Sequence, residues 1–274
     1  MAPTLGTFLL PEGFERPGFG TVLREGRVVR EAGRHVLWVK GDRRLGRSYV
    51  DRPVRYREPV VLVPGFMAGD FTLRLMAQAL RRRGHRTYRS LIRANVGCTV
   101  SAAGQLEARI EAISLRRGAR VHVVGHSLGG MLARGLAVRR PDLVSGIITL
   151  GSPMLAPAAH HASLTRSVDV LVRLSEAGVP GLMSADCVAG GCARESFEES
   201  RQPVPPEVSF TTIYSQLDGI VDWRACVDPL AVPVEVTASH LGMALDPRVV
   251  EAVAAALARH RESSVLEVDR SKGA

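Results

Sequence analysis

The sequence predicts an α/β protein whose mostly parallel sheet carries helices on both faces. Between residues 59 and 260, short continuous runs rich in Val, Ile and Leu alternate with longer segments in which apolar residues recur every three or four positions. The short runs are typical of parallel strands buried on both faces, and the longer segments are typical of the helices that cover such a sheet. The chain has 274 residues, of which 46% are hydrophobic and 5% aromatic, so it can form one large domain with a mainly aliphatic core.

The alternation predicts the elements in order. Strands are expected at residues 59–63, 86–90, 120–125, 145–151, 208–214 and 232–236. Helices are expected at residues 70–83 (with Asp70 as N-cap), 101–117, 131–137, 164–177 and 247–260. These elements place an α/β domain at residues 58–262, followed by a flexible polar tail at 263–274.

Two segments depart from the alternation. In residues 1–57 glycines interrupt any periodicity, and we predict an N-terminal extension that is packed on the core or frayed from it, with residues 35–39 as a strand or the end of a short helix. Residues 152–206 contain six prolines, and so long a segment between strands is typical of an insertion. Because it follows a strand of the sheet, we expect it over the carboxyl edge, either as a lid or cap or as a packing embellishment.

The strongest motif lies at residues 121–130. An apolar, β-branched run leads into Gly125-His126-Ser127-Leu128-Gly129, and a helical pattern follows. This is the Gly-x-Ser-x-Gly nucleophile elbow, in which a strained turn presents a serine at the carboxyl end of a sheet. A side chain at either of the two motif glycines would crowd that turn. We therefore predict Ser127 as a nucleophile.

Candidates for the base and its orienting acid follow in the chain order that this elbow requires. A serine hydroxyl needs a base within hydrogen-bond reach, and the base needs a carboxylate to orient it. Asp218 and Asp222 follow the strand at 208–214, and His240 follows the strand at 232–236. We predict His240 as the base and Asp218 as the acid, with Asp222 as the alternative acid or as a helix cap.

Acyl transfer also needs N–H donors for an oxyanion. One donor is expected from Leu128, the residue after the nucleophile, and the other from the loop after the strand at 59–63. Gly65 allows that loop to turn sharply, so the N–H of Phe66 is the preferred second donor and that of Met67 a weaker candidate.

Several stretches around these candidates match motifs of one family. They are Pro64-Gly65-Phe66, Gly125 to Gly130, Leu150-Gly151-Ser152-Pro153, Tyr214 to Val221, and Ser239-His240-Leu241-Gly242. Together they resemble bacterial α/β-hydrolases of the lipase and carboxylesterase kind, in particular actinobacterial ones, over about residues 59–260. The resemblance implies the α/β-hydrolase fold and a catalytic triad of Ser127, Asp218 and His240. The Pro-Gly before the oxyanion residue replaces the His-Gly of other esterase branches, as in several lipase relatives.

The expected reaction is hydrolysis of a small-molecule or lipid carboxylic ester through an acyl-enzyme on Ser127. No metal or organic cofactor is expected. An acyltransferase or thioesterase with the same triad is the main alternative, and a non-catalytic hydrolase-like binding module is a further one. No motif reports the length of the acyl chain.

The net charge of +9 comes almost entirely from arginine, since Lys40 and Lys272 are the two lysines, and it is spread along the chain. We therefore expect no nucleic-acid partner. No apolar run approaches the ~20 residues of a membrane span, and residues 1–20 lack the pattern of a secretory signal. We expect a cytoplasmic protein, for which peripheral contact with lipid stays open.

The four cysteines permit two disulfides. Cys187 and Cys192 flank a short glycine-rich loop, so a bridge between them is one candidate, and Cys98–Cys226 is then the other. Such bridges would favour a secreted or envelope protein over the reducing cytoplasm. The Cys-x4-Cys spacing has no matching second pair and is poor for zinc.

Overall fold

The computed structural model describes residues 5–44 and 56–272 and contains one parallel sheet in the order β2-β1-β3-β4-β5-β6. All five neighbouring strand pairs are parallel, which confirms the predicted fold class. The strands are β1 (Pro59–Val63), β2 (Arg86–Arg89), β3 (Val121–His126), β4 (Val144–Leu150), β5 (Ser209–Tyr214) and β6 (Val232–Glu235). Each lies within about two residues of its predicted range.

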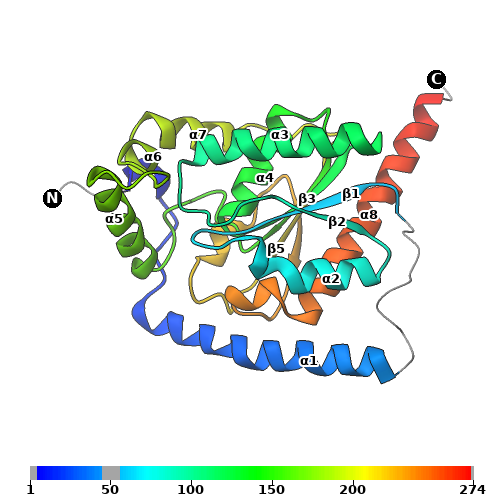
Figure 1. The fold of residues 1–274 in the computed structure, drawn as a ribbon, viewed down its shortest axis with the longest axis horizontal. Coiled ribbons are helices and arrows are strands. Elements are labelled where there is room, and N and C mark those ends of the chain that lie inside the picture. Colours follow the sequence, from blue (N-terminus) through cyan, green and yellow to red (C-terminus); the bar gives the residue numbers. More distant parts are fainter. Residues whose placement is uncertain (1–4, 45–55, 273–274) are drawn as a thin grey trace.

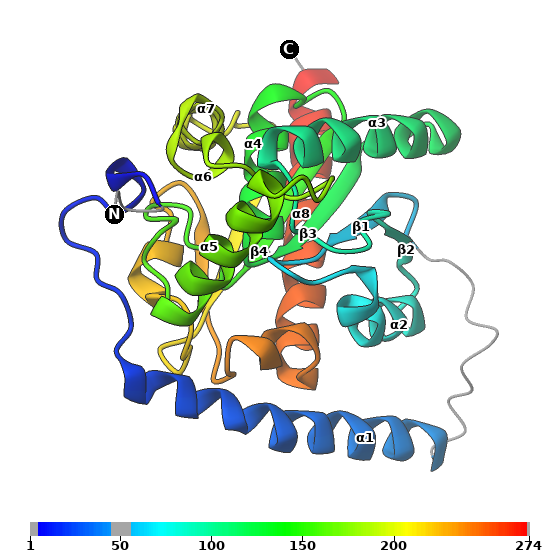
Figure 2. The same ribbon diagram turned by 60° about the vertical axis from the view of Figure 1, so that its left-hand side comes forward.

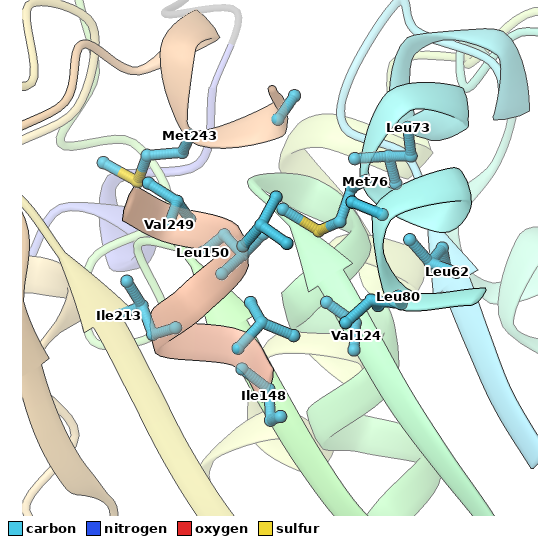
Figure 3. Close-up of a cluster of buried hydrophobic side chains, with 14 of the residues drawn as sticks. Leu62, Leu73, Met76, Leu80, Val124, Ile148, Leu150, Ile213, Met243 and Val249 are labelled. Atoms are coloured by element: carbon cyan, nitrogen blue, oxygen red, sulfur yellow. The ribbon is translucent and has the colours of Figure 1, made fainter. Parts of the chain in front are cut away.

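Helices cover both faces of this sheet (Figure 1). On one face, α2 (Arg74–Arg82) and α8 (Pro247–Lys272) pack against alternate residues of the strands, and Figure 3 shows their side chains meeting the sheet. On the other face, α3 (Thr99–Arg117) and α4 (Leu128–Arg139) pack against the intervening residues. In β1, Leu62 points to the first layer and Val63 to the second, as the two-residue period of a strand requires.

The order of the strands determines where a ligand site can form on this sheet. The chain passes from β1 outward to β2 and then returns to place β3 on the other side of β1. In an open parallel sheet, a crevice forms at the carboxyl ends of the strands where the order reverses, and ligands bind there. The loops after β1 and β3 meet at this point, and they carry Phe66 and Ser127.

Two predicted helix ends are wrong. The first helix begins with a 3-10 turn, η3 (Asp70–Leu73), whose N-cap is Gly69. The Asp70 carboxylate instead accepts hydrogen bonds from Ser90 and Leu91, so it anchors the end of β2. The predicted tail continues α8 to Lys272, because residues 261–272 contain neither glycine nor proline to stop the helix.

The N-terminal extension is largely helical where the structure describes it. It forms η1 (Thr7–Leu9), η2 (Phe19–Arg27) and α1 (Val28–Arg44), the helix along the lower edge of Figure 1; residues 1–4 and 45–55 lie outside the described residues. Residues 35–39 therefore lie within a longer helix than predicted. The tertiary contacts of buried Glu31 and His35 offset the cost of the glycines within α1.

The insertion forms three helices that lie together, on the left of Figure 1 and turned toward the viewer in Figure 2. These are α5 (Ala162–Glu176), which the sequence predicts, and the shorter α6 (Asp186–Ala189) and α7 (Gly191–Arg201), which it does not. Glu199 of α7 pairs with Arg139 of α4, so the insertion is joined to the core. No helix among the described residues combines the length and the apolar character that crossing a bilayer requires.

Candidate active site

Ser127 lies in a strained turn between β3 and α4. Its φ of 52° and ψ of −123° lie outside the regions that an L-residue ordinarily adopts. A Cβ at Gly125 would overlap the backbone of Gly129 and Gly130, and one at Gly129 would overlap the backbone of Val63. The glycines of the motif are thus required by close backbone approach, as the sequence predicts.

His240 and Asp218 lie together beside this turn. Nδ1 of the His240 imidazole donates to Oδ2 of Asp218 at 2.6 Å, and both side chains are buried. Burial alone would lower the pKa of His240, but the charge of Asp218 and the hydrogen bond to it, with the charge of Glu25, raise that pKa above its ordinary value. Ser127 and His240 line the same pocket, although no hydrogen bond of the described residues joins the serine hydroxyl to the imidazole. Such contacts are often long before substrate binds.

Asp222 faces a different partner. Its carboxylate pairs with Arg224 at 3.0 Å and accepts from the backbone N–H of the same residue, so it caps the 3-10 turn η4 (Trp223–Cys226). It also accepts from the N–H of Glu15. The capping interpretation of Asp222 is therefore confirmed, and the structure brings Asp218 rather than Asp222 to His240.

The loop after β1 lies against Ser127. A Cβ at Gly65 would lie 3.0 Å from Cβ of Ser127, so a glycine lets the two loops approach. The Met67 N–H donates to the carbonyl of Asn95 at 3.0 Å and is therefore engaged. Among the hydrogen bonds of the described chain, none uses the N–H of Phe66 or of Leu128. The N–H groups of Phe66 and Leu128 therefore remain the candidate donors to a ligand at Ser127.

Two carboxylates of the N-terminal extension hold the His240 loop, and no pattern in the sequence predicts either of them. Glu25 is buried and accepts from the backbone N–H groups of Gly219, His240 and Leu241 at 2.9–3.0 Å. Glu31 is fully buried and accepts from the N–H and the hydroxyl of Ser239. No local motif marks these residues, because each acts on a loop more than 190 positions away.

His126, within the elbow itself, was also missed. Its Nε2 donates to the backbone carbonyl of His240 at 3.0 Å, and the two rings lie 4.9 Å apart. Burial, with the nearby His240, lowers the pKa of His126 to about 3, so this imidazole stays neutral. A histidine directly before the serine of the motif was the available signal.

Two hollows meet at Ser127. The first, a cavity of about 140 Å³, lies beneath the insertion and is lined mainly by apolar side chains, among them Leu5, Leu9, Met131, Leu164, Val168, Met183 and Phe197. The second, of about 360 Å³, contains His240 and is lined by Val28, Met67, Ile220 and Leu241 among others. Both hollows include Phe66 and Ser127, so the serine is reached from two sides.

The structure contains neither of the two expected disulfides. All four cysteines are free thiols, and buried Cys226 lies beside the backbone carbonyl of Asp222 instead of near Cys98. Sγ of Cys98 lies 3.2 Å from Sγ of Cys192. Burial, together with the neighbouring thiols, raises the pKa of Cys192 to about 12. The sequence contains no signal for the spatial proximity of Cys98 and Cys192, which are 94 positions apart.

Comparison with known proteins identifies the family of this chain. Residues 60–271 match the family model described as "Alpha/beta hydrolase family", and the chain belongs to this family. The model covers the sheet and the loops that carry Ser127, Asp218 and His240, together with the insertion.

Individual relatives are more distant. The chain is 32% identical over 148 residues to a triacylglycerol lipase of Vibrio cholerae, a match that spans 50% of this chain and 46% of that protein. The match thus covers about half the length of the curated relative. Among solved structures, the mature Bacillus licheniformis lipase BlEst2 is similar with a TM-score of 0.56 at 15% identity, over 73% of this chain and 91% of that one. A monoglyceride lipase variant from Saccharomyces cerevisiae has a TM-score of 0.54 at 13% identity, over 78% and 87%. These structures share the fold; a specific affinity to actinobacterial members stays a prediction.

Proposed function

We propose that the protein hydrolyses carboxylic esters through an acyl-enzyme on Ser127. The observation that carries the proposal is the 2.6 Å contact between Asp218 and His240 beside a strained serine turn. A buried carboxylate on Nδ1 fixes the imidazole in the tautomer whose Nε2 can accept a proton, and it stabilises the imidazolium that forms. The similarity to a curated triacylglycerol lipase supports an ester as substrate.

In the proposed reaction, each of these residues has one role. His240 accepts the proton of Ser127 as the serine oxygen attacks the ester carbonyl, and the N–H groups of Leu128 and Phe66 stabilise the oxyanion. His240 then donates the proton to the departing alcohol. Water attacks the acyl-enzyme by the same route in reverse, and the carboxylic acid leaves.

We assign the two parts of the ester to the two hollows beside Ser127. The apolar cavity beneath the insertion suits an acyl chain, because burial of methylene groups there contributes about 0.8 kcal/mol each. The hollow that contains His240 then receives the alcohol, which the imidazole must protonate. In this assignment the insertion acts as the lid or cap over the acyl chain.

Replacement of Ser127 by alanine tests the proposal. We expect Ser127→Ala to lose turnover of short p-nitrophenyl esters by about 1000-fold or more, together with labelling by a fluorophosphonate probe. Ser196→Ala is the matched control, because Ser196 lines the same cavity but belongs to no motif. Unchanged labelling of Ser127→Ala would refute the proposal. Ester products formed with an added alcohol acceptor would reassign the protein as an acyltransferase.

A further inference from the structure

Outside the candidate active site, three thiols meet where the insertion contacts α3. Cys98 is the N-cap residue of α3, Cys187 lies in α6, and Cys192 lies in α7. Their Sγ atoms all lie within 4.8 Å of one another. All three residues are partly exposed, whereas Cys226 is buried elsewhere. Figure 1 shows α7 beside α3, the two helices that bring Cys192 to Cys98.

The turn between α6 and α7 brings Cys192 close to Cys187. The Asp186 carboxylate accepts from the N–H of Gly191 at 2.8 Å and from the N–H of Cys192 at 3.2 Å. A Cβ at Gly190 would overlap the same carboxylate, so this position requires glycine. The two cysteines of the insertion are thus held together by a specific side chain.

The loop before Cys98 is joined to the insertion by its backbone. The Met183 N–H donates to the carbonyl of Val96 at 2.9 Å. A Cβ at Gly97 would lie 3.0 Å from the carbonyl oxygen of Gly181, so the two chains pass at close range. This contact places the thiol of Cys98, 89 positions before Cys187 in the chain, next to Cys187 and Cys192. The spacing of Cys187 and Cys192 does not by itself make a metal site.

A disulfide uses two thiols, whereas three converging thiols form a ligand set for a soft metal ion. Thiolates select Zn²⁺ and Cu⁺ among the metals of the cell. Zinc–sulfur bonds of 2.3 Å place the sulfurs around one ion about 3.8 Å apart, within the spread of this cluster. We propose that Cys98, Cys187 and Cys192 together bind one thiophilic metal ion, Zn²⁺ or Cu⁺. The three thiol protons pass to solvent as the ion binds, and no oxidation or reduction is involved.

The two ions differ in what they need besides the three thiolates. Cu⁺ is satisfied by the three thiolates, whereas a structural Zn²⁺ takes a fourth ligand. That ligand would be water or the hydroxyl of Ser184, whose Oγ lies 3.4 Å from Sγ of Cys187. Either ion would join α3 to α6 and α7. Thr99, Cys187 and Val188 line the cavity next to Ser127. The ion would therefore stabilise the contact between the insertion, which covers that cavity, and α3.

Metal retention by the full chain tests the proposal. The protein is reduced under anaerobic conditions, loaded with Zn²⁺ or with Cu⁺, passed through a desalting column with a weak chelator, and analysed by mass spectrometry of the metals. We expect about one equivalent of one of the two ions in the wild-type protein and a higher thermal midpoint than in the metal-free protein. Cys98→Ser, Cys187→Ser and Cys192→Ser should each lose most of the bound metal. Cys226→Ala is the control and should retain it.

Alkylation of thiols by iodoacetamide gives a second readout on the same samples. Bound metal should slow alkylation of the three clustered cysteines together. Circular dichroism of each variant establishes that it is folded before its metal content is compared. Failure of the wild-type protein to retain either ion would overturn the proposal, as would equal retention by Cys98→Ser and Cys226→Ala.

Discussion

Oε1 of Glu25 accepts a hydrogen bond from the backbone N–H of His240 at 3.0 Å. The same atom accepts from Gly219 at 2.9 Å, so one carboxylate joins the loop of Asp218 to the loop of His240. Since the reacting groups of a triad must be placed to within a fraction of an ångström, this contact makes the N-terminal extension part of the support of the site.

Glu25→Gln should impair both stability and activity. An amide can accept on its oxygen only, so its NH₂ group would face one of the three N–H donors and leave it unsatisfied. We expect a loss of about 1–3 kcal/mol in the free energy of unfolding. We also expect kcat/KM for a p-nitrophenyl ester to fall by up to about 100-fold. Exposed Glu12, replaced by Gln, is the control from the same extension. A normal kcat/KM in folded Glu25→Gln would show that the Glu25 carboxylate stabilises the fold but does not position the candidate catalytic residues.

The two aspartates after β5 should respond differently to removal of their charge. Asp218→Asn loses the carboxylate on Nδ1 of His240, and kcat should fall by about 10⁴-fold. Asp222→Asn can still cap the turn, but it loses the ion pair with Arg224 and one carboxylate acceptor for the N–H of Glu15, so it should retain activity while the free energy of unfolding falls by about 1 kcal/mol. Steady-state kinetics and urea denaturation of both variants check this pair. The opposite pattern would make Asp222 the acid.

The pH profile should follow the raised pKa of His240. The imidazole accepts a proton only when it is neutral, so kcat/KM should fall as the pH decreases through a pKa above the ordinary 6.5. In Asp218→Asn the raising influence of the carboxylate is gone and burial remains, so the same limb should move to lower pH. Residual activity measured across pH tests this shift. A wild-type limb centred below 6.5 would contradict a raised pKa of His240.

Gly151 lies against the His240–Asp218 hydrogen bond, so a side chain there would crowd these two residues. Its φ is +55°, and a Cβ there would lie 3.1 Å from Nδ1 of His240 and 3.2 Å from Oδ2 of Asp218. Gly118 has nearly the same φ, +58°, with no atom within 4 Å of its Cβ position. Both alanine variants should lose about 1–2 kcal/mol from left-handed backbone strain. Only Gly151→Ala should also lose kcat, and equal kinetics in the two variants would show that the pair tolerates the methyl group.

A buried ion pair joins α4 to the segment before β6. Arg134 Nε lies 2.7 Å from Oδ2 of Asp228, and both side chains are almost fully buried. Arg134→Met leaves a buried carboxylate without compensation, so the free energy of unfolding should fall by about 3–5 kcal/mol in urea titrations. Arg139→Met, on the same helix, breaks a more exposed pair with Glu199 and should cost less than about 1 kcal/mol. Adding Asp228→Leu to Arg134→Met should recover much of the loss, and an unchanged loss would exclude the uncompensated charge as its cause.

Much of the site could be predicted because its signals are local. The elbow is a continuous stretch in which close backbone contacts require glycine, and the loops of Asp218 and His240 each follow a recognisable strand. The roles of Glu25 and Glu31 could not be predicted, since a buried carboxylate in a helix looks like a surface one until its partners are known. The chain beyond residue 262 shows the same limit, because polar composition alone did not distinguish a helix from a tail.

By itself, the sequence determined the alternation of strands and helices, the position of the serine turn and the order of the candidate residues after it. These features depend on neighbours within a few positions, and the side-chain periods of strands and helices record them directly. Only the tertiary structure decided that Asp218 and not Asp222 meets His240, that two N-terminal glutamates hold its loop, and that Cys98 joins Cys187 and Cys192. Most of these contacts join residues that are tens to hundreds of positions apart, where packing and not local pattern selects the partner.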